Sequence, residues 1–223
     1  MQNRNQSWSV LILICLLAAC CGCPNEKTSD KTDAGNVSKT NDVEPKAIQP
    51  AVPTMPEVHM SEATEATCKV FAEDPMREAD LPDLQGAVQR LPDLYGKSKL
   101  TVLFFWIDGQ SEFDRMVVVD DLALLQQNFA GPLAEKGVQV IGVNVGDSAE
   151  VVRGRLAEAE ATFANFLDGD RKFFAEVATE GLPRVYLLDE KGKILWFDAE
   201  FSENSRKTLF VAIEAGLGEI LEE

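Results

Sequence analysis

The sequence predicts a single α/β domain in which helices flank a central mixed β-sheet. Two continuous apolar runs, residues 100–106 and 137–145, have the composition of strands buried on both faces. Each run precedes a segment with helical periodicity, which predicts a parallel pair of strands joined by a crossover helix. Closer to the C-terminus, Glu190-Lys191-Gly192 separates two further strands and predicts a hairpin that adds an antiparallel edge.

The remaining elements follow from turn residues and helical spacing. Residues 81–97 are punctuated by Pro, Asp and Gly and predict a small hairpin or loop ahead of the core strand. A helix is expected from about Asp114 to a break at Gly131-Pro132. Its apolar positions are Met116, Val119, Leu122, Leu125 and Phe129.

Three more helices are expected further along the chain. One covers residues 148–163 with Ser148 as its N-cap, and a short one covers residues 172–180. The last helix lies in residues 202–223. Its expected apolar face consists of Phe210, Ile213, Leu217 and Ile220.

Length and charge limit the class of protein. The chain has 223 residues, of which 45% are hydrophobic, enough for one globular domain and a tail. Its net charge is −16, from 37 acidic against 21 basic residues. Because a nucleic-acid partner requires cations that displace phosphate counterions, this balance argues against one.

The N-terminus has the features of an export signal. Arg4 precedes an apolar run, residues 10–19, that is too short for a bilayer span of about 20 residues. Leu17-Ala18-Ala19-Cys20 resembles the lipobox of bacterial lipoproteins. The resemblance implies cleavage before Cys20 and lipid attachment to its thiol, which would hold the protein in the bacterial cell envelope, in the periplasm or on the outer face. The alternative is an ordinary secretory signal cut near Ala19.

The predicted signal peptide, residues 1–19, is followed by a polar segment, residues 20–67. This segment lacks aromatic residues and is rich in Pro, Ser, Thr, Asn, Asp, Glu and Lys, a composition that predicts a disordered, lipid-anchored linker. Residues 68–80 form a transition to the folded domain, residues 81–223. The only histidine, His59, lies in the linker without partner ligands, so no metal site is expected.

Three motifs carry a resemblance to a known family. They are "LTVLFFW", "GVQVIGVNVGD" and "GLPRVYLLDEKGKIL", which begin at Leu100, Gly137 and Gly181. Together with the order of elements, they resemble the thioredoxin fold and, more narrowly, the TlpA/ResA-type membrane-anchored thiol–disulfide oxidoreductases of the redoxin group. The likeness covers residues 81–223 and implies that Pro183 is the cis proline of that fold.

The family's active members place Cys-x-x-Cys shortly after the Phe-Trp that ends the central strand. Laid over this sequence, the motif puts Gln110 and Phe113 at the two cysteine positions and Gly109 at a tryptophan. Neither Gln nor Phe forms a thiolate, so dithiol exchange is chemically excluded here. A peroxiredoxin-type cysteine is also missing, because no cysteine follows Cys68. We therefore predict no catalytic residue and no cofactor at this site.

The resemblance also implies a binding groove, formed by Trp106, Phe113, Leu182 and Pro183. In the family, a substrate peptide lies in this groove, and the apolar side chains here are suited to binding a peptide or an envelope protein without reaction. The alternative is that they only close the core. The neighbouring acids Asp108, Glu112 and Asp114 are expected to favour the helix start.

Two functions of different classes follow. The favoured one is a non-catalytic binding or scaffold module with a degenerate active site. The alternative is a redoxin-family oxidoreductase with residual activity through Cys68 or a partner's thiol. Against the alternative, we favour the interpretation of Cys68 as an incidental thiol or as one bridged to Cys21 or Cys23 in an oxidising compartment.

Overall fold

The computed structural model of the chain describes residue 51 and residues 53–221. The predicted signal peptide, the lipid attachment at Cys20 and the thiols of Cys21 and Cys23 lie outside the described residues. No helix in the described part of the chain is both long and apolar enough to cross a membrane.

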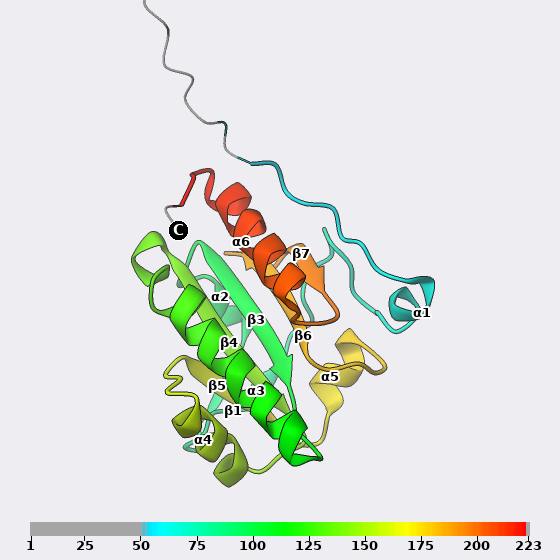
Figure 1. Cartoon of the computed structure of the whole chain (residues 1–223), viewed down its shortest axis with the longest axis vertical. Coiled ribbons are helices and arrows are strands. Elements are labelled where there is room, and N and C mark those ends of the chain that lie inside the picture. Colours follow the sequence, from blue (N-terminus) through cyan, green and yellow to red (C-terminus); the bar gives the residue numbers. More distant parts are fainter. Residues whose placement is uncertain (1–50, 52, 222–223) are drawn as a thin grey trace, which may run out of the picture. The chain divides into compact units, whose positions relative to one another are not determined.

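A five-stranded mixed sheet forms the centre of the fold, as the sequence predicts. Strand β3 (Leu100–Trp106) pairs in parallel with β4 (Val138–Val145) and antiparallel with β6 (Arg184–Asp189). Strand β5 (Ala164–Asp168) extends the sheet beyond β4, and β7 (Ile194–Asp198) extends it beyond β6, giving the order β5-β4-β3-β6-β7 (Figure 1). All seven residues of β3 are buried, which explains its uninterrupted apolar sequence.

One face of the sheet is covered by α3 (Glu112–Leu125), α4 (Ala149–Glu158) and α6 (Glu203–Leu217). The π-helical turn η1 (Gln126–Ala130) continues α3 up to Gly131. Side chains of alternate β3 residues, such as Phe104 and Trp106, pack into this layer.

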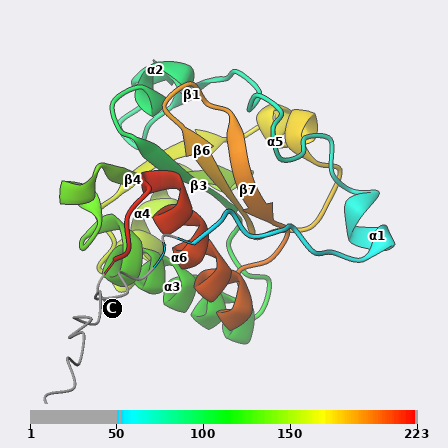
Figure 2. The ribbon, with the colours of Figure 1, turned by 90° about the horizontal axis from the view of Figure 1, so that it is seen from above.

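The other face is covered by shorter segments, as the view from above shows (Figure 2). They include α2 (Pro92–Tyr95), α5 (Lys172–Val177) and the hairpin of β1 (Asp80–Pro82) and β2 (Val88–Arg90). A 3-10 turn η2 (Ala134–Lys136) leads into β4.

Strand β5 is a difference from the sequence prediction, which extended a helix to residue 163. Helix α4 ends at Glu158 because Glu160 takes a left-handed conformation, with φ of 51°, and the amide of Ala161 donates to Leu156 O at 2.9 Å. The chain then enters the sheet as an edge strand. This strand was missed because Asn165 and Asp168, two of its buried residues, are polar.

The folded unit begins earlier than the predicted boundary at residue 68. Met55 and Val58 pack against the core, and a short helix, α1 (Glu62–Glu65), precedes Cys68. Val70 is fully buried and Met76 nearly so. The polar composition of residues 53–67 predicted disorder, but their few apolar side chains pack against the core.

The face of the last helix also differs from the prediction. Leu209, Ala212 and Ile213 are fully buried, whereas Ile220 lies beyond the end of α6 and is 42% exposed. Phe210 and Leu217 are only partly buried. Of the predicted face, Ile213 is therefore fully buried, while Ser205, Leu209 and Ala212 supply the rest of the buried side of the helix.

Candidate functional site

The turn between β3 and α3 holds the positions where the family's cysteines would lie. Ser111 is the N-cap of α3: its hydroxyl accepts from the amide of Asp114 at 3.1 Å, and the Asp114 carboxylate accepts from the amide of Ser111 at 3.1 Å. This reciprocal capping box starts the helix directly after Gln110. Gln110 and Phe113 are both exposed, the latter by 69%.

Gly109 is required by the close approach of the turn to the helix. A Cβ at this position would lie 2.4 Å from the amide nitrogen of Arg115 and 2.5 Å from backbone and side-chain atoms of Asp114. The carbonyl of Gly109 also accepts a hydrogen bond from Arg115 Nε at 3.2 Å. No larger residue fits this turn unless the start of α3 moves.

Asp108 fastens the same turn to α4. Its carboxylate accepts from Arg155 Nε at 2.7 Å and from Nη2 at 3.2 Å, and its amide donates to Asp147 Oδ2 at 2.7 Å. Burial raises the pKa of Asp108, but the hydrogen bonds and charge of Arg155 outweigh it and hold that pKa below its ordinary value. Asp108 therefore forms a structural ion pair with Arg155. The sequence instead predicts that it favours the start of the helix.

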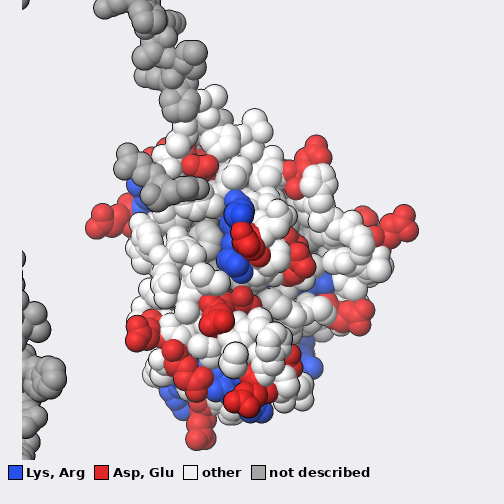
Figure 3. All heavy atoms as spheres, viewed as in Figure 1, with Lys and Arg blue, Asp and Glu red and all other residues white. Residues whose placement is uncertain are grey.

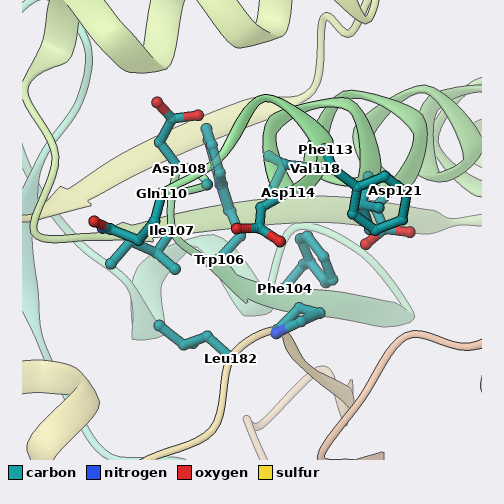
Figure 4. A pocket seen from close by; sticks show the side chains of 13 residues that line it. Phe104, Trp106, Ile107, Asp108, Gln110, Phe113, Asp114, Val118, Asp121 and Leu182 are labelled. Atoms are coloured by element: carbon teal, nitrogen blue, oxygen red, sulfur yellow. The ribbon is translucent and has the colours of Figure 1, made fainter.

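The four predicted groove residues, Trp106, Phe113, Leu182 and Pro183, line one pocket of about 440 Å³ (Figure 4). Gln110 lines it as well. The Leu182–Pro183 peptide bond is cis. Trp106 is held by its indole N–H, which donates to Asn165 Oδ1 at 3.1 Å.

An exposed apolar strip borders this pocket on α3. Phe113, Met116 and Val117 are 69%, 56% and 42% exposed and share one side of the helix. The sequence prediction assigned Met116 to the apolar, core-facing side of the helix, and the structure corrects this. Contiguous apolar exposure beside a hollow is typical of a binding surface.

The pocket contains one acid that the sequence analysis missed, Asp121. It is 9% exposed and lines the pocket from α3. Burial raises its pKa to about 7, against a lowering by the charge of Arg206 and a further raising by Asp120. No distinct signal in the sequence marks it, because Asp121 follows a second acid, Asp120, and lies outside the apolar positions predicted for this helix.

Cys68, the candidate redox thiol, does not line the pocket. It pairs with Ala178 in a β-bridge and packs against the core layer that contains α5, on the face of the sheet opposite α3. It forms no disulfide among the residues that the structure describes, and its Sγ accepts from Arg184 Nη1 at 3.1 Å. Arg184 itself is buried, with 1% of its surface exposed.

No group of three or more metal-ligating side chains occurs among residues 53–221. The groups available in the pocket are three carboxylates, Asp108, Asp114 and Asp121, together with the amide of Gln110 and apolar walls. These side chains can hold a ligand by contact and charge, and none is a thiol.

The sheet order, the flanking helices and the loop of Pro183 beside the β3–α3 turn define a thioredoxin-like fold. The chain belongs to the AhpC/TSA family, whose model matches residues 72–197. No curated protein sequence matches the chain significantly.

Solved structures support the fold. A provisionally described protein disulfide isomerase from Bacteroides thetaiotaomicron is 20% identical, with a TM-score of 0.59, over 69% of this chain and 94% of that one. Peroxidoxin BcpB from Mycobacterium tuberculosis is 18% identical, with a TM-score of 0.53, over 64% of this chain and 96% of that one. At these identities, the likeness establishes the fold alone.

Proposed function

We propose that this protein is a non-catalytic binding module, in which a thioredoxin-like groove is kept and the dithiol chemistry is lost. One observation carries the proposal: Gln110 and Phe113, at the family's cysteine positions, line the same pocket as Leu182 and Pro183. This pocket supports a groove in which an amide and an aromatic ring occupy the positions where the resemblance implies cysteines. The occupant is proposed to be a peptide segment of an envelope protein.

The exposed apolar strip supports this proposal. Burying the side chains of Phe113 and Val117 against a partner would remove apolar area that the folded domain leaves in water, at about 25 cal/mol per Å². A cavity of about 440 Å³ lies within the range typical of ligand pockets.

Capture of partners from an envelope extract tests the groove. The chain with Phe113→Ser and Leu182→Ser is expected to lose partners that the unaltered chain retains, because both changes remove apolar contact area from the pocket. Val88→Ser is the matched control, since Val88 is 66% exposed on the β1–β2 hairpin and does not line the pocket. Retention of the same partners by the groove variant would show that the groove is not the binding site.

We also propose that the domain is tethered to a membrane by lipid on Cys20, in the periplasm or on the outer face of a bacterium. The support is the sequence Leu17-Ala18-Ala19-Cys20 at the end of a short apolar run. Growth with a radioactive fatty acid is expected to label the unaltered protein and not Cys20→Ala. Label that persists in the variant contradicts the anchor.

A further inference from the structure

Asp121 places a carboxylate in an otherwise apolar wall of the pocket. It is 9% exposed and extends from α3, where Phe113, Val117 and Val118 also line the cavity. Figure 4 shows Asp121 among the side chains with which α3 lines the pocket. The acid is therefore part of the lining and is largely withdrawn from solvent.

This carboxylate has no hydrogen-bond or ion-pair partner among residues 53–221. Arg206 on α6 is the nearest cation that acts on it, but Arg206 Nη1 donates to Phe201 O at 3.0 Å and its guanidinium lies 5.6 Å from the centre of the Phe201 ring. Partial loss of solvent disfavours the charged carboxylate, and burial accordingly raises the pKa of Asp121 to about 7. A donor supplied by a ligand would satisfy it.

The other charges around the pocket favour a cation. Asp108 and Asp114 line the same cavity, and no lysine, arginine or histidine is found among its described lining residues. Asp108 is paired with Arg155, and Asp114 is engaged in the capping box, so Asp121 is the acid left to a ligand. Acidic side chains also prevail on the face that carries α3 and α6 (Figure 3).

We propose that the pocket selects peptide segments that present a basic side chain between apolar residues, with the basic group donating to Asp121. This inference rests on the proposed function and adds the chemistry of the partner. A lysine suits the lining because its aliphatic stem can contact Phe104, Val118 and Leu182 while its ammonium reaches the carboxylate. The apolar neighbours of the lysine in the peptide would lie against Phe113 and Val117, two residues of the exposed apolar strip.

The test uses three peptides, acetylated and amidated at their ends, of sequence Ala-Leu-X-Leu-Ala with X as lysine, methionine or glutamate. Their affinities for the full chain are measured by calorimetry in buffer above the pKa of Asp121. The lysine peptide is expected to bind about tenfold more tightly than the methionine peptide, from one charge-assisted hydrogen bond, and the glutamate peptide most weakly. Added salt should weaken binding of the lysine peptide most.

A matched pair of variants assigns the effect. Asp121→Asn is expected to reduce the affinity for the lysine peptide to that for the methionine peptide. Asp120→Asn removes the same charge from the adjacent, exposed position and is expected to preserve the preference. A preference that survives Asp121→Asn overturns the inference.

The two proposals fail in distinguishable ways. Equal affinity for the lysine and methionine peptides, abolished by Phe113→Ser, overturns the charge preference and leaves groove binding in place. Absence of binding by all three peptides overturns the charge preference as well. Groove binding is then tested by the capture of partners from the envelope extract. If the proposed function is correct, the variant with Phe113→Ser and Leu182→Ser no longer captures them.

Discussion

Replacing Gln110 and Phe113 together with cysteine is expected to give the chain a thiol–disulfide exchange activity. Both positions are exposed, so the changes leave the core intact. Gln110 immediately precedes the N-cap of α3 and Phe113 lies in its first turn, where the N–H groups lower the pKa of a nearby thiol and increase its thiolate fraction. Reduction of insulin in the presence of dithiothreitol should rise above the background of the unaltered chain.

The single variant Gln110→Cys and the unaltered chain provide the controls. Gln110→Cys alone supplies a nucleophile without a resolving thiol and is expected to stop at a mixed disulfide. If the double variant forms its disulfide and still reduces insulin only at the background rate, the loss of the two cysteines is not the reason that the site lacks activity. Turnover by the unaltered chain that disappears in Cys68→Ser would instead support residual redox activity through Cys68.

The central strands could be predicted because a strand that is buried on both faces consists of an uninterrupted run of apolar residues. Strand β3 shows this most clearly, and the motif around Pro183 further specifies how β6 and β7 follow. Strand β5 has no such run, because an edge strand with buried Asn165 and Asp168 has a mixed composition. Asp168 is there for a local reason: its carboxylate accepts from the amides of Phe173 and Phe174 at 3.2 Å and 2.7 Å.

The groove could be predicted from a resemblance, whereas its electrostatics could not. The pairing of Asp108 with Arg155 joins residues 47 positions apart, and nothing in their local sequence indicates the partner. Asp121 follows Asp120 and, in the sequence alone, resembles any acidic pair on a solvated helix. Only the arrangement of α3 against β3 shows that one of the two is exposed and the other is withdrawn into the pocket.

Replacing Arg184 with alanine is expected to lower the free energy of unfolding by about 3 kcal/mol. The guanidinium is buried and has no carboxylate partner among residues 53–221, so neutral acceptors hold it. It donates to Gly181 O at 2.9 Å, Glu180 O at 2.7 Å and Cys68 Sγ at 3.1 Å, and it also bonds the Thr67 hydroxyl. The alanine variant leaves these acceptors unpaired and opens a cavity. Urea denaturation measures the loss.

An exposed arginine separates this effect from a general loss of charge. Within the described part of the chain, Arg77 is exposed and donates only to Lys69 O, at 3.4 Å, so Arg77→Ala is expected to change the free energy of unfolding by no more than about 0.5 kcal/mol. Similar values for the two variants would contradict the role assigned to Arg184.

The same arginine connects the two faces of the sheet. Its hydrogen bonds to the carbonyls of Glu180 and Gly181 fix the backbone just before Leu182 and Pro183, which line the pocket. Its hydrogen bonds to Thr67 and Cys68 connect this loop to the N-terminal segment. Arg184→Ala should therefore lose groove partners under conditions in which it remains folded. Cys68→Ser, which removes one acceptor and leaves both carbonyl contacts, should keep them. If Arg184→Ala retains its partners while folded, the groove wall does not depend on this support.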